Sequence, residues 1–135
     1  MEEVEQDNLF ITFQQTIESV IKEKKQNPKY EKLLNKFNAR VIIGLQIEKD
    51  YYFWVNLVAK DGEYSLGKGK LDEYDLELKA APGDLLFFVN GENSVINMVL
   101  KNNSFGYKKL RFSKGSTGKR NLGILLRLSK ILVLD

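Results

Sequence analysis

Apolar side chains recur at helical spacing in the first segment of the chain, after an acidic and polar start. We expect residues 1–8 to be flexible and the first helix to begin after Asp7 or Asn8. Lysines close this segment, where cations favour the helix dipole, and Asn27-Pro28 is typical of the start of a second helix. The apolar faces of this helical pair are Phe10, Phe13, Ile17, Val20 and Ile21, then Tyr30, Leu33, Leu34 and Phe37.

From residue 39 the apolar period changes to two, which is the spacing of a strand with one buried face. Lys49-Asp50 and Asp61-Gly62 are typical of the tight turns that join antiparallel strands. The pattern therefore predicts a meander of four strands, at residues 39–47, 51–59, 63–70 and 74–80.

Beyond residue 80 the pattern predicts two short helices, a fifth strand and a terminal helix. Pro82 opens the first short helix, Gly91 stops it and Ser94 caps the second. The fifth strand lies within residues 107–112, and the terminal helix spans about residues 119–132. On that helix the polar stripe is Arg120, Gly123, Arg127 and Lys130, and the apolar face is Leu122, Leu125, Leu126, Leu128 and Leu132.

Together these elements predict one α+β domain over residues 1–135. No repeat or linker divides the chain. The expected fold is a five-stranded mixed, mainly antiparallel sheet covered by helices, with the helical pair at the N-terminus and an amphipathic helix at the C-terminus.

The amino-acid composition excludes most kinds of catalytic site. The chain has no His and no Cys, which excludes Ser-His-Asp triads, thiolate nucleophiles, disulfides and the usual zinc sites. An enzyme would need Asp, Glu, Lys or Tyr with a shifted pKa, so we expect no catalysis, metal or cofactor. Because the acidic start is unlike a signal peptide and no apolar run reaches roughly 20 residues, we place the protein in the cytoplasm.

The net charge of +3 is unevenly distributed. Residues 1–100 carry 12 basic and 17 acidic side chains, whereas residues 101–135 carry 9 basic and 1 acidic. This basic C-terminal segment could bind nucleic acid, contact an anionic membrane weakly or simply be solvated. Since nothing in it resembles a nucleic-acid module, nucleic acid is not an expected partner.

Two polar clusters can each be interpreted either as a functional site or as ordinary solvated surface. Segment 115–120 lacks the spacing of a phosphate loop, but Ser116, Thr117 and the next helix could hold an anionic head group, unless they form a solvated cap. The carboxylates Asp72, Glu73, Asp75 and Glu77 could act as acid and base or hold a hard cation. We favour the plain reading of this second cluster, a solvated sheet face.

The segment from Asp75 to Gly91 resembles the central signature of the sterol carrier protein type-2 family. Phe53-Trp54-Val55 is similar to the family's aromatic strand, and residues 110–115 to its last strand, so the resemblance covers about residues 39–132. Residues 102–107 look like an insertion. The matching positions in the central signature are Asp75, Leu78, Asp84, Leu85, Leu86 and Gly91.

This resemblance implies an apolar tunnel between sheet and helices, which would carry a fatty acid, an acyl chain or a sterol-like lipid. Three segments are more apolar than one buried face requires, at residues 85–89, 95–100 and 122–134. Such an excess fits a cavity lining, although for each residue taken alone plain core is the favoured interpretation. The expected lining is Phe53, Val55, Leu57, Leu85, Phe88, Val95, Met98, Val99, Phe112, Leu122 and Leu126, and the head-group or anionic-surface residues are Lys119, Arg120, Arg127 and Lys130.

A second hypothesis is an interaction module. In that case the terminal helix docks on a partner protein or on a second copy as a homodimer, and the basic C-terminal segment contacts an anionic surface. The leading hypothesis remains a non-catalytic carrier whose partner is an apolar small molecule or lipid.

Overall fold

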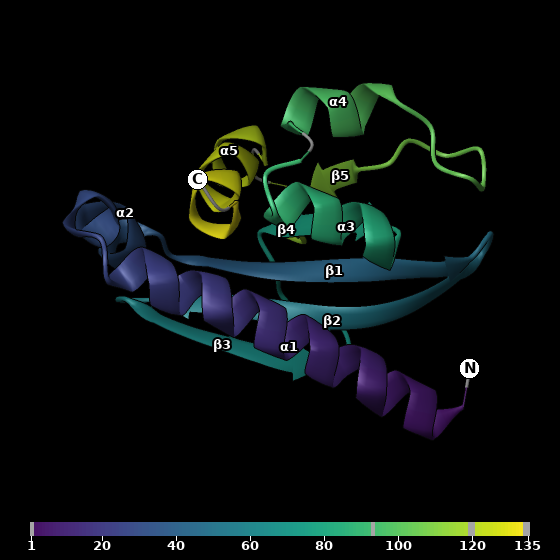
Figure 1. Ribbon diagram of the computed structural model, residues 1–135, viewed down its shortest axis with the longest axis horizontal. Coiled ribbons are helices and arrows are strands. Elements are labelled where there is room, and N and C mark those ends of the chain that lie inside the picture. The colour runs from purple at the N-terminus through teal and green to yellow at the C-terminus, as the bar shows by residue number, and fades with distance from the viewer. Residues whose placement is uncertain (1, 93, 119–120, 134–135) are drawn as a thin grey trace.

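The computed structural model describes residues 2–92, 94–118 and 121–133. Helices and strands follow one another much as the periodicity predicts (Figure 1). The helices are α1 (Glu3–Lys25), η1 (Pro28–Tyr30), α2 (Glu31–Lys36), α3 (Pro82–Val89), α4 (Val95–Leu100) and α5 (Leu122–Leu132). The strands are β1 (Ala39–Glu48), β2 (Tyr51–Lys60), β3 (Glu63–Lys68), β4 (Leu76–Ala80) and β5 (Arg111–Lys114).

The five strands form one sheet in the order β3-β2-β1-β4-β5. Strand β4 runs parallel to β1, from the pair Val41–Leu76 to the pair Leu45–Ala80, and all other pairings are antiparallel. The predicted α+β fold with a mixed, mainly antiparallel sheet is therefore confirmed. The meander is wrong for the fourth strand, because the chain crosses from β3 at one edge to the free side of β1.

Several predicted boundaries are also wrong. Strands β3 and β4 cover residues 63–68 and 76–80 rather than 63–70 and 74–80. Helix α1 begins at Glu3 rather than after Asp7, so residues 3–8 form its first turns, and Glu3 and Glu5 place negative charge where the helix dipole favours it. Strand β5 lies at residues 111–114 rather than within 107–112, since its register follows β4. The terminal helix begins at Leu122, and residues 119–120 lie outside the described part of the chain.

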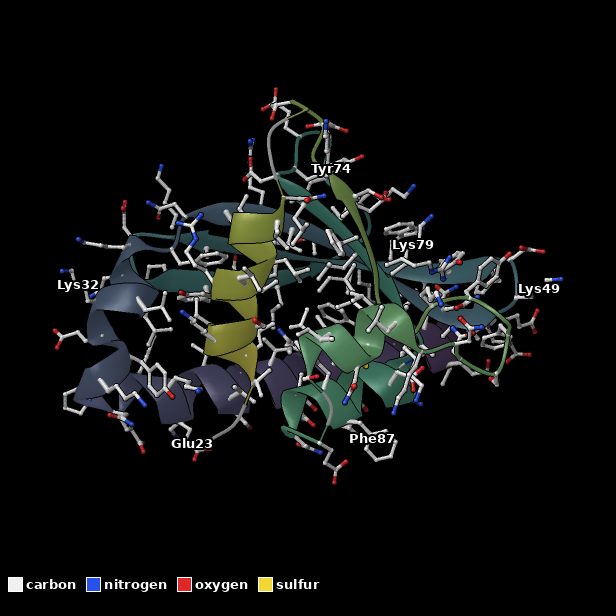
Figure 2. The ribbon with its side chains drawn as sticks, turned by 90° about the horizontal axis from the view of Figure 1, so that it is seen from above. Glu23, Lys32, Lys49, Tyr74, Lys79 and Phe87 are labelled. Atoms are coloured by element: carbon white, nitrogen blue, oxygen red, sulfur yellow. The ribbon has the colours of Figure 1, made fainter. Side chains whose placement is uncertain are left out.

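The helices lie on one side of the sheet, as the two views show together (Figures 1 and 2). The main core fills the space between them. Its sheet side consists of alternate residues, namely Ala39, Val41, Ile43 and Leu45 of β1, Phe53, Val55, Leu57 and Ala59 of β2, and Leu76, Leu78 and Ala80 of β4. Figure 2 shows Lys79 on the opposite side of the sheet from the helices that carry Glu23 and Phe87.

Helix α5 is amphipathic, but its buried face differs from the predicted one. Leu125, Leu128, Ile131 and Leu132 are buried. Leu122 and Leu126 are 53% and 46% exposed, so the prediction that they belong to the apolar face is wrong. The reason is angular: these two residues lie one turn apart on the same side of the helix, and Leu126 is rotated by about 100° from Leu125.

Candidate functional site

An apolar pocket of about 200 Å³ lies between α1 and α3, above β1. It is open to solvent on one side. Helix α1 forms one wall and α3 the other, with Leu45 of β1 between them. The lining residues are Leu9, Thr12, Phe13, Thr16, Ile17, Leu45, Pro82, Gly83, Leu85, Leu86 and Val89.

Two hydroxyls are the main polar groups in this pocket, and both are engaged within α1. The Thr12 hydroxyl donates to the Asn8 carbonyl oxygen at 3.0 Å, and the Thr16 hydroxyl donates to the Thr12 carbonyl oxygen at 2.8 Å. Neither donor is therefore directed at a ligand. None of the described residues that line the pocket carries a charge, so its chemistry suits an apolar group.

A second, more polar pocket of about 530 Å³ lies on the other side of α3. It is bounded by η1, α3, the start of α4 and the end of α5. Two lysines and two serines share it with apolar side chains, and among the residues that the structure describes no carboxylate lines it. The lining residues are Lys29, Tyr30, Phe88, Ser94, Val95, Ser129, Lys130 and Val133.

The hydroxyl of each serine in the second pocket forms a hydrogen bond with the backbone of its own helix. The Ser94 hydroxyl oxygen accepts the backbone N–H of Asn97 at 3.1 Å, as the predicted cap requires. The Ser129 hydroxyl donates to the Leu126 carbonyl oxygen at 2.8 Å. Positive charge from Lys29 and Lys130 therefore dominates this pocket, which favours an anionic group.

The eleven predicted lining residues are distributed over both pockets, the core and the surface. Leu85 lines the first pocket, and Phe88 and Val95 line the second. Val99 and Phe112 pack against the core while partly buried, and Leu122 and Leu126 are exposed. The others are buried in the core, and they are Phe53, Val55, Leu57 and Met98.

Of the two predicted head-group residues that the structure describes, Lys130 lines the second pocket and Arg127 lines neither pocket. The Arg127 guanidinium donates through Nε to the Gly123 carbonyl oxygen at 3.2 Å. Lys119 and Arg120 lie outside the described residues. The Ser116 hydroxyl, expected near a head group, instead accepts the backbone N–H of Tyr74 at 3.0 Å.

The wall formed by α1 was missed by sequence reasoning. Phe13 and Ile17 are expected core residues, but Leu9, Thr12 and Thr16 are not predicted to line a site. A signal was present, because residues 9, 12, 13, 16 and 17 are spaced as one helical face. Two threonines on an otherwise apolar face would have indicated a cavity edge.

The cluster of carboxylates before β4 has a structural partner. Glu73 and Asp75 both bind the Arg40 guanidinium, at 3.0 and 3.3 Å. The hydrogen bonds that the guanidinium donates to Asp75 and then to Glu73 raise the pKa of Arg40. Within residues 2–92, 94–118 and 121–133, no group of three or more acidic side chains is arranged to hold a metal ion. No helix in the same ranges is long and apolar enough to cross a membrane.

Comparison with solved structures identifies the fold as that of a sterol carrier protein 2 domain. The sterol carrier protein domain 2 of Helicoverpa armigera matches 86% of this chain and 81% of its own, with a TM-score of 0.61 and 10% identity. A protein described as UbiJ-SCP2, a ubiquinone synthesis protein, matches 93% and 89%, with a TM-score of 0.63 and 6% identity. Sterol carrier protein 2 from Yarrowia lipolytica, in its apo form, matches 73% and 80%, with a TM-score of 0.52 and 18% identity.

These likenesses confirm the predicted resemblance at the level of the fold. No protein-family model matches the chain, and no curated protein matches it.

Proposed function

We propose that the protein is a non-catalytic carrier of apolar ligands, such as a fatty acid, an acyl chain or a sterol-like lipid. The observation that supports this most directly is the pocket between α1 and α3, whose two hydroxyls already bond to helix carbonyls. An apolar chain loses no hydrogen bond on entering such a site, and it covers apolar surface that would otherwise meet water.

The pocket of about 200 Å³ is smaller than the roughly 300–1,000 Å³ of typical ligand sites. A whole lipid therefore requires α3 to move. Leu86 and Phe87 on this helix are 47% and 51% exposed, so these two side chains do not anchor it to the core. We infer that its movement opens a path to the predicted lining residues Phe53, Val55, Leu57, Leu85, Met98, Val99 and Phe112.

The second pocket would hold the polar end of the ligand. It borders α3 through Phe88, next to Val89 of the first pocket, so one amphiphile could span both. Lys29 and Lys130 would then face an anionic head group. The apolar chain would lie against Leu85 and Val89.

Gly83 allows a direct test, because a Cβ atom placed there meets no atom within 4 Å and the residue lines the pocket. We expect Gly83→Phe to fill the pocket and abolish binding of a fluorescent fatty acid. Gly123→Phe is the matched control, since a Cβ at Gly123 is equally unobstructed but lies on α5 outside this pocket.

Solvent extraction and mass spectrometry of purified protein complete the test. We expect lipid from the unaltered chain and the Gly123 variant, and none from the Gly83 variant. Free ligand at 100 times its Kd stabilises the folded state by about 2.7 kcal/mol, so Tm rises by several degrees. The proposal fails if no lipid is extracted and no fatty acid or sterol shifts Tm, or if both glycine variants bind equally.

A further inference from the structure

The face of the sheet opposite the helices carries aromatic rings and cations in one row. Trp54 of β2 pairs with Gly44 of β1, Gly44 pairs with Lys79 of β4, and Lys79 pairs with Arg111 of β5. Gly44 has no side chain to occupy the middle of this row. Ring carbons of Trp54 lie 3.0–3.2 Å from the position that a Cβ at Gly44 would take, so the indole packs onto β1 there.

Two tyrosines and one more lysine extend this surface, which we call the aromatic–cationic face. Tyr52 neighbours Trp54, with ring centroids 6.1 Å apart. Lys70 Nζ lies 4.2 Å from the Trp54 centroid, and the Arg111 guanidinium lies 4.4 Å from that of Tyr107. The face consists of Tyr52, Trp54, Lys70, Lys79, Tyr107 and Arg111, and each of these side chains is at least half-buried except the exposed Lys70.

Rings and cations alternate along this face. The ammonium of Lys79 lies between two rings, 5.1 Å from the centroid of Tyr52 and 5.9 Å from that of Trp54. The Arg111 guanidinium likewise lies 5.4 Å from Tyr52. A ligand that crosses the strands would therefore meet π surface and positive charge in turn.

The three cations of the face have no carboxylate partner within the described part of the chain. The ion pairs there engage other basic residues, namely Arg40, Lys68 and Lys109. Arg111 donates through Nη2 to the Gln46 side-chain oxygen at 3.0 Å, but its Nε is buried with no hydrogen-bond partner. Cations without a carboxylate partner, beside partly exposed ring surface, point to an anionic ligand.

We propose that the aromatic–cationic face binds single-stranded nucleic acid. Bases would stack on Tyr52 and Trp54 while Lys70 and Lys79 shift on their flexible stems to the phosphates, which is how sheet surfaces bind single strands without sequence preference. This surface lies opposite the lipid pocket and is distinct from the C-terminal helix. The sheet assembles it from segments far apart in the sequence.

Other anionic partners fit the face less well. An acidic peptide would use the cations but leave the ring surfaces without a stacking partner. An anionic membrane favours aromatic side chains that project into the interface, whereas these rings pack half-buried on the strands. The alternation of rings with cations favours a strand in which bases alternate with phosphates.

The single tryptophan of the chain, Trp54, reports directly on stacking. We expect an oligo(dT) of about 12 nucleotides, within the known range of site sizes, to quench its fluorescence at low salt. Inorganic polyphosphate should compete for the face without quenching, because it carries charge but no π surface. Failure of oligo(dT) to quench Trp54, or equal quenching by polyphosphate, would overturn the proposal.

Charge reversal locates the binding surface. Lys70→Glu with Lys79→Glu should weaken oligo(dT) binding about tenfold or more, and lower the slope of log K against log salt by about 1.4 for two lost phosphate contacts. The matched control is Lys22→Glu with Lys32→Glu, at exposed positions of α1 and α2, which changes the net charge equally and should leave the slope unchanged.

Three outcomes would reject nucleic acid as the partner: equal loss in both double variants, tighter binding of polyglutamate than of oligo(dT), or tighter binding of anionic vesicles. Should the reversed pair fail to fold, Lys70→Gln at an exposed position repeats the measurement with a smaller expected loss. Fatty-acid binding serves as an independent check, because it uses the opposite side of the sheet and should be unaffected.

Discussion

Asp75 and Arg40 bind each other where β4 starts to pair with β1. The backbone N–H of Arg40 donates to Asp75 Oδ2 at 2.8 Å, and the backbone N–H of Asp75 donates to the Arg40 carbonyl oxygen at 2.7 Å. The guanidinium Nη2 adds a contact of 3.3 Å to Asp75 Oδ1. The parallel pairing begins at the next residue of each strand, so this contact sets the register of the crossover.

Removing the Asp75 carboxylate should therefore destabilise the parallel pairing. We expect Asp75→Ala to lower the free energy of unfolding by about 2 kcal/mol, the usual contribution of hydrogen bonds to a charged acceptor. Asp75→Asn keeps a hydrogen-bond acceptor, so its free energy of unfolding should fall by less. Asp72→Ala, at a nearby exposed position, should stay within about 0.5 kcal/mol in urea unfolding, and an equal loss there would contradict the argument.

Gly115 directly follows β5 and lies unusually close to the backbone that precedes β4. A Cβ atom at this position would lie 2.2 Å from the Tyr74 carbonyl oxygen and 2.6 Å from the Asp75 Cα, both backbone atoms that cannot easily move. Gly115→Ala should cost about 1–3 kcal/mol of stability through overpacking. Gly123→Ala, in a helix with open space around it, should instead stabilise by about 0.5–1 kcal/mol. If Gly115→Ala leaves the stability in thermal unfolding unchanged, the clash is ruled out.

Tyr64 links β3 to α2 and should make stability depend on alkaline pH. Its hydroxyl donates to the Leu34 carbonyl oxygen at 2.9 Å, and burial raises the pKa of Tyr64 to about 12. Folding thus favours the neutral phenol, so its contribution is complete below about pH 10 and is lost as pH rises toward about 12.

The comparison with Tyr64→Phe isolates this effect. At neutral pH the variant should be about 1 kcal/mol less stable, because the hydrogen bond is missing. As pH rises above about 10, the gap in urea unfolding free energy between the two proteins should narrow, since only the unaltered protein retains a phenol to titrate. A gap that stays constant over this range would show that Tyr64 ionises as easily in the folded state as in the unfolded state.

Periodicity predicts which residues are buried far better than it predicts their neighbours. Leu76 and Leu78 alternate with Glu77 and Lys79, and the structure buries the leucines as expected. The same alternation is compatible with pairing to β3 or to β1, because it reports only which side of the strand is covered. The Asp75 contact that decides between them joins residues 35 positions apart, and no local pattern reveals it.

The candidate site shows the same limit. Leu85, Phe88, Val95 and Lys130 are predicted site residues that do line pockets, since each belongs to a conspicuously apolar or basic segment. Their division between two pockets depends on how α3 packs between α1 and α5. The aromatic–cationic face escaped prediction for the same reason: strand pairing alone brings residues 54, 79 and 111 into one row.

Lys130 and Arg127 provide a matched pair for testing where an amphiphile places its head group. Both are exposed cations on α5, but Lys130 lines the second pocket, whereas Arg127 turns to the Gly123 carbonyl oxygen. Lys130→Glu should weaken binding of a fatty acid about fivefold, which corresponds to about 1 kcal/mol for an exposed ion pair. Added salt should reduce the difference.

Arg127→Glu changes the net charge identically and should leave the Kd of the fatty acid nearly unchanged. A fatty alcohol of the same chain length provides the second control, because it has no carboxylate for Lys130 to attract. We expect the Lys130→Glu variant to bind this alcohol as tightly as the unaltered protein does, measured by displacement of a fluorescent lipid. If Lys130→Glu weakens binding of the alcohol as much as binding of the acid, Lys130 shapes the pocket rather than recognising charge. If Arg127→Glu weakens binding of the fatty acid as much as Lys130→Glu does, the head group responds only to the overall electrostatic field of α5. In that case it does not lie in the second pocket.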